Sequence, residues 1–178
     1  MRIADILYFA PGIKFAELDL SGQILPEQFE KRMKGFYLEP AAAMIRNGHA
    51  FACGLLLVSC IDALARLHLS TGVGDRFRSW VKAQLQSFAS NDIAHRFYDE
   101  FRNGLVHEGR IKNGGQFALD QPETVVIVSR CLSINPKYLA DEVNDALHRY
   151  VAELKGNTNT RNELLDRIKT DFRHELEG

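Results

Sequence analysis

The sequence predicts a mainly α, up-and-down helical bundle of four to five main helices with one inserted β-hairpin. Apolar residues recur at helical spacing over residues 41–108 and again over 136–176. The period changes only around residues 115–134, where β-branched residues and alternating runs appear. With 178 residues, 46% of them hydrophobic and 25% charged, the chain suits one soluble domain with a buried core.

The first helices follow from prolines and apolar stripes. Pro26 opens a polar helix that Pro40 is expected to end or bend, because the residue before a proline avoids the helical region. Residues 41–69 are apolar on nearly every side in their middle, which is typical of a central bundle helix. Amphipathic helices are expected over residues 75–88 and 91–108.

The remaining elements complete a single predicted domain over residues 1–178, with a core at about 41–155. Residues 1–25 show no clean period and are expected to be irregular, with one short helical turn at residues 3–9. The hairpin should have strands near 116–119 and 124–134, joined by a turn at Asp-Gln-Pro-Glu. A helix should start at Pro136, and a capping box at Thr160 should start the last one, to residue 176.

Composition excludes several classes of protein. The net charge of −1 argues against a general nucleic-acid trap, so any RNA contact must come from a local patch. The longest uncharged run, residues 47–61, is shorter than the roughly 18–20 apolar residues of a membrane span. Asp5 interrupts any secretory signal, and we expect a cytoplasmic protein without membrane contact. Spacings typical of metal sites, a P-loop or GxGxxG are lacking, so no metal or cofactor is expected.

The stretch FRNGLVHEGR, residues 101–110, carries the candidate chemistry. On an α-helix Arg102 and His107 lie about 140° apart, so they do not share a face. Asn103 and His107, four residues apart, do, and the amide is expected to orient the imidazole. Arg102 would reach the same volume if the helix frays or kinks near Gly104, or if a second copy of the chain supplies its own motif.

RNA cleavage without a metal requires three groups. A base removes the 2′-hydroxyl proton, an acid protonates the leaving 5′-oxygen, and a cation stabilises the charged phosphorus transition state. One chain offers a single histidine in this segment, whereas a two-fold dimer would offer two histidines and two guanidinium groups.

The RNGLVH segment resembles the Arg-x4-6-His motif of the HEPN family (higher eukaryotes and prokaryotes nucleotide-binding domains). HEPN domains are helical up-and-down bundles with this motif at the end of the third core helix, which corresponds to residues 91–108. The resemblance implies a metal-independent endoribonuclease that acts on RNA as a homodimer, with Arg102 and His107 catalytic and Asn103 supporting them. It also implies that Asp62, on the second core helix, orients or pairs with the arginine.

Many HEPN enzymes act as toxins, in phage defence or in RNA processing, sometimes with a protein partner such as an antitoxin. The alternative is a HEPN bundle that only dimerises, binds RNA or regulates another protein. The resemblance carries no indication of DNA as a substrate.

Neighbouring residues have both a functional and a plain structural interpretation. Three cations, Arg96, Arg110 and Lys112, are candidates for an RNA-binding rim, although each one singly is typical of a solvated face. Tyr98 lies off the centre of the apolar stripe and is a candidate for stacking on a base, with Glu108 as a further supporting residue. Equally, Arg102 could form a surface ion pair with Asp99 or Glu108, and His107 could simply cap the helix.

Overall fold

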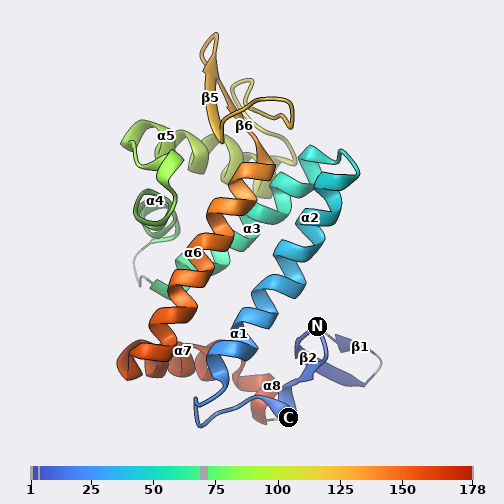
Figure 1. The fold of residues 1–178 in the computed structure, drawn as a ribbon, viewed down its shortest axis with the longest axis vertical. Helices are drawn as coiled ribbons and strands as arrows, with labels where there is room; N and C mark the ends of the chain where they lie inside the picture. The colour runs from blue at the N-terminus through green and yellow to red at the C-terminus, as the bar shows by residue number, and fades with distance from the viewer. Residues whose placement is uncertain (1, 4, 69–71, 178) are drawn as a thin grey trace. The chain divides into compact units, whose positions relative to one another are not determined.

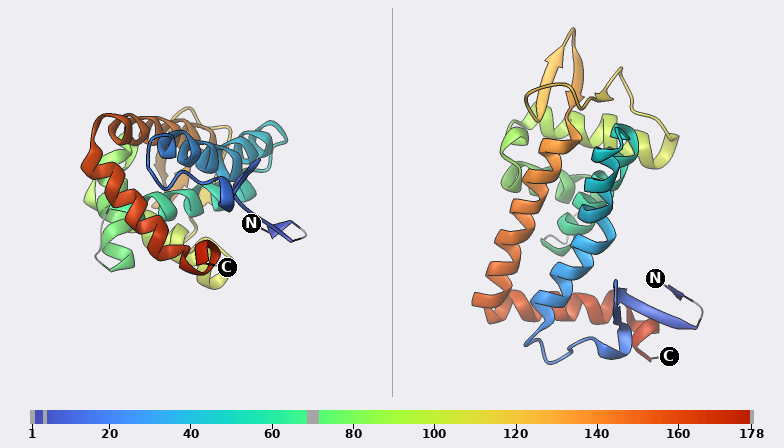
Figure 2. Two further views of the ribbon diagram at one scale, coloured as in Figure 1. Left: turned by 90° about the horizontal axis from the view of Figure 1, so that it is seen from below. Right: turned by 45° about the vertical axis from the view of Figure 1, so that its right-hand side comes forward.

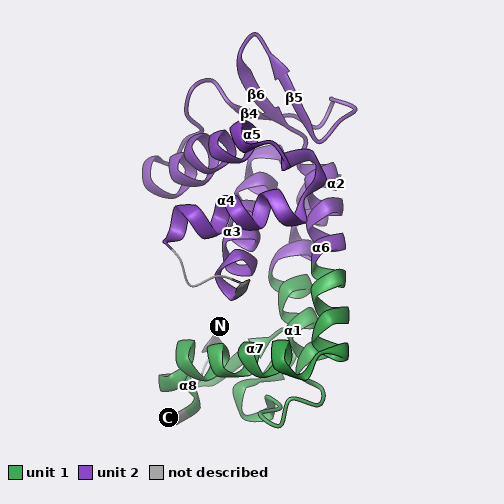
Figure 3. Cartoon of the chain, turned by 90° about the vertical axis from the view of Figure 1, so that its left-hand side faces the viewer, with its two compact units in different colours: residues 1–36, 147–178 green, residues 37–146 purple. Residues whose placement is uncertain are grey.

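The computed structural model describes residues 2–3, 5–68 and 72–177, and it confirms the predicted helical bundle with a hairpin (Figure 1). Contacts between residues divide the chain into two compact units (Figure 3). Unit 1 comprises residues 1–36 and 147–178, and unit 2 comprises residues 37–146. Every candidate site residue, from Asp62 to Lys112, belongs to unit 2.

Unit 1 contains a small sheet that the sequence analysis missed. Its three antiparallel strands follow one another in the order β1-β2-β3, and Gly12, with φ of 72°, turns the chain between β2 and β3. The expectation of an irregular segment with a helical turn was wrong, although Pro11-Gly12 between two short apolar runs is a hairpin signal. The elements of unit 1 outside α6 are β1 (Arg2–Ile3), β2 (Ile6–Ala10), β3 (Ile13–Lys14), η1 (Phe15–Glu17), α1 (Leu25–Met33), α7 (Thr158–Asp171) and α8 (Arg173–Glu177).

Aromatic rings join the N-terminal segment of unit 1 to its C-terminal helices, which lie beside it in both views of Figure 2. The ring of Phe15 lies 5.2 Å from that of Phe172, and Phe9 packs edge-on against both rings. The last long helix starts earlier than predicted, because Asn157 rather than Thr160 accepts hydrogen bonds from the free N–H groups of the first turn.

One proline, Pro40, and one glycine, Gly48, divide the helices differently from the prediction. Pro40 does not end the helical segment, because a π-helical stretch, η2 (Lys34–Leu38), is followed at once by α2 (Glu39–Arg46) with Pro40 in its first turn. The expected single helix over residues 41–69 is interrupted at Gly48, whose φ of 74° is left-handed. The apolar helix is therefore α3 (Ala50–His68).

The core of unit 2 is built around α3 and a cluster of phenylalanines. Four phenylalanine rings are fully buried. The ring of Phe97 lies at the centre and contacts those of Phe77, Phe88 and Phe101. Phe117 continues the cluster and lies against Gly54 of α3, where a Cβ would come within 2.2 Å of the ring. The other helices are α4 (Val73–Gln84), η3 (Gln86–Phe88), α5 (Asn91–Arg96), η4 (Phe97–Glu108) and α6 (Pro136–Gly156), the last shared between the units.

The hairpin occupies the predicted region but turns at a different place. Strands β5 (Val125–Val128) and β6 (Cys131–Ile134) are antiparallel, and Ser129 and Arg130 connect them with φ values of 48° and 69°. Two consecutive residues with positive φ form the tight hairpin turn that suits strand twist. The strand β4 (Gln116–Phe117) pairs parallel to β6, so Asp-Gln-Pro-Glu is a crossover loop and not the hairpin turn.

Helix α3 is apolar enough to merit comparison with a membrane span. By length and composition, Ala50–Leu67 could cross a membrane, and it is the one helix among the described residues that could. The segment is longer than the uncharged run at residues 47–61, because the helix continues beyond that run and includes the charged residues Asp62 and Arg66. A buried core helix has the same composition, and about 44% of this segment is buried.

The three cysteines are free thiols with different environments. Burial raises the pKa of Cys53 to about 11 and that of Cys60 to about 12, so both remain protonated at neutral pH. Cys131 is only half-buried. We therefore expect a thiol reagent at pH 8 to label Cys131 quickly and the other two only as the protein unfolds. Mass spectrometry of the labelled peptides checks this, and rapid labelling that persists in a Cys131→Ser variant would contradict it.

Candidate functional site

The helix that carries FRNGLVHEGR changes from α-helical to π-helical hydrogen bonding at Phe97, where η4 begins. In a π-helix each N–H bonds to the carbonyl five residues earlier, so residues five apart lie above one another. Arg102 and His107 have this spacing, and Nη1 of Arg102 lies 3.4 Å from Nε2 of His107. The expectation that one helix keeps them on different faces was wrong, because it assumed α-helical geometry. A single chain brings the pair together.

The backbone after η4 folds back and lies against the middle of the motif. Gly109 forms a left-handed cap at the end of η4, with φ of 67°, and reverses the chain. The N–H of Arg110 then donates to the carbonyl of Gly104 over 3.2 Å, and the N–H of Lys112 donates to the carbonyl of Glu100 over 2.9 Å. A Cβ at position 104 would lie 2.4 Å from the carbonyl oxygen of Arg110, so glycine is required for this close approach.

Arg102 is held by a carboxylate from another helix. Its Nη2 donates to Oδ2 of Asp62 on α3 over 2.9 Å, and the Arg102 side chain is 13% exposed. The pairing with Asp62 that the family resemblance implies is therefore present, and the alternative ion pairs with Asp99 or Glu108 are not formed. Asn103 does not bond to His107 as expected, because its Oδ1 accepts a 3.3 Å hydrogen bond from Nη1 of Arg102.

His107 has one ring nitrogen directed at Arg102, and the residue is exposed. Because a guanidinium can only donate, a hydrogen bond across the 3.4 Å separation requires Nε2 as the acceptor and the ring proton on Nδ1. A neutral imidazole with this tautomer has one lone pair, on Nε2, so a hydroxyl must take the place of the guanidinium there before His107 can act as a general base.

Two polar atoms of the Arg102–Asp62 pair are buried without a hydrogen-bond partner in the described part of the chain. They are Oδ1 of Asp62 and Nε of Arg102. Leaving such a group unpaired costs about 1–3 kcal/mol, and unpaired buried groups are uncommon in native proteins. The pair is therefore not arranged for greatest stability, which is typical of residues that serve a function.

The predicted RNA-binding rim is largely tied up by acidic neighbours. Arg96 donates to the buried carboxylate of Glu100 over 2.7 Å and to the carbonyl of Arg130 over 2.9 Å, so it joins η4 to the hairpin turn. Hydrogen bonding from Lys112 and the charge of Arg110 lower the pKa of Glu108, which stays ionised. Glu108 lies 2.6 Å from Arg110 and 3.0 Å from Lys112. Its position indicates that it balances the rim cations and does not support the Arg102–His107 pair.

Tyr98 is half-buried beside the pair and contacts two arginines. The guanidinium carbon of Arg102 lies 5.9 Å from the centre of its ring, and that of Arg78, on α4, lies 5.0 Å from it. Gly74 provides the space, because a Cβ there would come within 3.0 Å of the Tyr98 ring. Sequence reasoning missed Arg78, which shares no local motif with residues 98–107.

Within the described residues, His, Cys, Asp and Glu side chains form no group of three that could hold a metal ion. Comparison with protein-family models, with curated protein sequences and with solved structures gives no significant match to this chain. The HEPN resemblance therefore stays a prediction that rests on the RNGLVH motif and its place in the bundle.

Proposed function

We propose that the protein is a HEPN-like, metal-independent endoribonuclease. In the proposed reaction the 2′-oxygen of one nucleotide attacks the adjacent phosphorus, the bond from phosphorus to the 5′-oxygen breaks, and a 2′,3′-cyclic phosphate forms. His107 accepts the 2′-hydroxyl proton, and Arg102 stabilises the negative charge that develops on the phosphorane oxygens. Asp62 and Asn103 position the guanidinium through their hydrogen bonds.

The observation that carries this proposal is the 3.4 Å approach of Arg102 to His107 in a π-helical turn. A protonated imidazole would repel the guanidinium at this distance, so the pair is favourable only while His107 is neutral and its Nε2 accepts. The two groups together complement an RNA phosphodiester, which is anionic and lies next to a ribose 2′-hydroxyl. The exposed side of His107 leaves this pair accessible to a polymer.

A second copy of the chain would complete the set of proton-transfer groups. The leaving 5′-oxygen needs a proton donor, and the motif holds one histidine. A stripe of α3 leads to the site: Phe51, Leu55, Ser59, Asp62 and Arg66 fall within about 80° around the helix axis. Phe51 is 48% and Leu55 38% exposed, and Val106 of the motif is 51% exposed. Apolar side chains exposed beside Asp62 favour burial against another copy, and the proposed enzyme is a homodimer.

A non-catalytic role as a dimerisation or RNA-binding module, or as the regulatory partner of another protein, is the second candidate. The neutralised rim supports it, because Glu108, Asp99 and Glu100 engage Lys112, Arg110 and Arg96. An enzyme that holds a long RNA by its phosphates usually keeps such cations available. A role in a toxin system or in phage defence, with an antitoxin as partner, rests on the family resemblance alone.

Cleavage of RNA in the presence of EDTA tests the proposed function. Purified protein is incubated with a mixture of structured and unstructured RNAs, and the ends of the products are identified. We expect fragments that carry 2′,3′-cyclic phosphate and 5′-hydroxyl ends, because the 2′-oxygen is the nucleophile. Matched DNA and 2′-O-methyl RNA should stay intact. Products with 3′-hydroxyl ends, or activity that appears only when Mg²⁺ is added, would refute this mechanism.

A further inference from the structure

A polar hollow between α4 and α5 lies next to the candidate site. It has a volume of about 490 Å³, which is within the roughly 300–1,000 Å³ typical of small-ligand pockets. Arg78 and Lys82 of α4 line one side, and Asn91, Asp92 and His95 of α5 line the other. Lys82 donates a hydrogen bond to Asn91 across the hollow.

Arg78 connects the hollow to the Arg102–His107 pair. Its guanidinium carbon lies 5.0 Å from the centre of the Tyr98 ring, whose other arginine neighbour is Arg102. Asp75 anchors it through a 2.6 Å ion pair, and the Arg78 side chain remains 29% exposed. Tyr98 is thus the common neighbour of the proposed reaction centre and of the hollow.

The charges of the hollow balance, which limits what it can bind. Asp75 and Asp92 offset Arg78 and Lys82, so the hollow does not attract a polyanion by charge alone. It offers instead a guanidinium plane backed by an aromatic ring, together with amide, carboxylate and imidazole groups. Unpaired RNA bases are recognised by such a combination, with the face stacked on an arginine or aromatic plane and the edge hydrogen-bonded.

We infer that the hollow between α4 and α5 is a subsite for one unpaired nucleotide next to the phosphate held by Arg102. The base of this nucleotide stacks on the Arg78 guanidinium over Tyr98, and its polar edge faces Asn91, Asp92 and His95. The position of the subsite relative to cleavage rests on the proposed ribonuclease function. Binding in it does not, because it requires no reaction. The subsite would select single-stranded RNA, since a paired base cannot leave its stack.

Binding of a single-stranded 2′-O-methyl oligonucleotide, which lacks the attacking hydroxyl, tests the inference. We expect Arg78→Ala and Tyr98→Ala each to weaken binding about tenfold, the effect of losing one stacked base. Tyr98→Phe keeps the ring and should bind like wild type. Lys137→Ala is the matched control, because Lys137 also lies over a tyrosine, at 5.4 Å from the Tyr138 ring, outside the hollow. It should leave binding unchanged.

The possible outcomes separate the subsite from the reaction. If the wild-type protein cleaves RNA but the Arg78→Ala and Lys137→Ala variants bind the oligonucleotide equally well, the subsite is overturned. The proposed function then still stands. Binding that depends on Arg78 in a protein that cleaves no RNA would support the subsite and count against the enzyme. Failure of the wild-type protein to bind the oligonucleotide, or tighter binding of a duplex than of a single strand, would overturn the subsite. Circular dichroism of each variant verifies that it is folded.

Discussion

Replacement of His107 by alanine is expected to lower the rate of RNA cleavage about 100- to 10,000-fold, the usual contribution of a positioned general acid or base. The fold should be unaffected, because His107 is exposed and lies 3.4 Å from Arg102 without being buried in the core. The loss should therefore appear in kcat rather than in protein stability. Cleavage in EDTA followed with a fluorescent RNA measures the rate, and thermal unfolding measures the stability.

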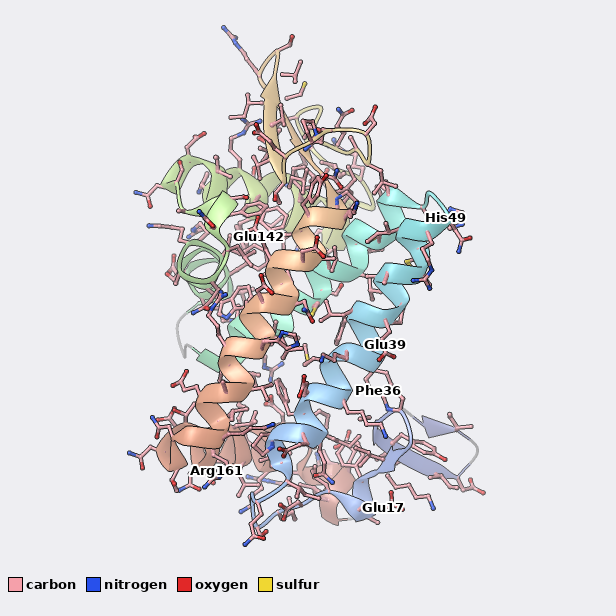
Figure 4. The ribbon with its side chains drawn as sticks, in the orientation of Figure 1. Glu17, Phe36, Glu39, His49, Glu142 and Arg161 are labelled. Carbon is pink, nitrogen blue, oxygen red and sulfur yellow. The ribbon has the colours of Figure 1, made fainter. Side chains whose placement is uncertain are left out.

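His49 provides the matched control for this experiment. It is exposed in the loop between α2 and α3 (Figure 4), away from the motif in sequence, and His49→Ala should cleave RNA at the wild-type rate. Added imidazole should partly restore cleavage to His107→Ala by entering the space that the side chain leaves. Equal loss of activity in both variants, or full activity of His107→Ala, would rule out His107 as the proton-transfer group.

Gly104→Ala is expected to have the largest effect on the structure of the site. The new methyl group would lie 2.4 Å from the backbone carbonyl oxygen of Arg110. Arg110 cannot easily move, because its N–H donates a hydrogen bond to the carbonyl of Gly104. The segment after Gly109 must then move away from η4. Forcing a methyl group into such a contact costs about 1–3 kcal/mol in the free energy of unfolding. We also expect a clear loss of cleavage, because Arg102 and His107 lie on either side of the displaced turn.

Gly156→Ala is the matched control for the strain at Gly104. Gly156 ends α6, and a Cβ there would meet nothing within 4 Å. Alanine favours a helix over glycine by up to about 1 kcal/mol, so this variant should be as stable as the wild type or more so. Chemical unfolding monitored by circular dichroism compares the two. A Gly104→Ala protein as stable and active as Gly156→Ala would show that the close approach of Arg110 is unimportant.

The RNGLVH motif shows most clearly what residue order predicts and what it does not. The residues themselves were found from their types and order, and the Asp62 partner was found from the family resemblance. The geometry was not, because the α-helical angle of about 140° was applied to a segment that forms a π-helix. The backbone that returns at Arg110 and Lys112 bonds to carbonyls of this same helix, and residue order did not predict that contact either.

The side-chain partners of Arg96 and the unusual hairpin turn account for two other differences. Arg96 was predicted to face RNA, but Glu100 and the carbonyl of Arg130 hold it, and Arg130 is 34 residues away. The hairpin turn was placed at a proline-containing segment, whereas two residues with positive φ, neither of them glycine, make the turn. Ordinary turn preferences disfavour that choice, so local sequence rules could not have identified it.

Local patterns were sufficient for the bundle, because burial of apolar stripes at helical spacing depends mainly on residue order. They were also sufficient to single out Arg102 and His107, whose chemistry is a property of their side chains. The contact between these two residues required the π-helical turn, which residue order did not predict. The Arg78–Tyr98 contact and the hydrogen bond from Arg96 to the carbonyl of Arg130 required the folded chain. These last two contacts join segments that meet only after packing, so no short stretch of residues encodes them.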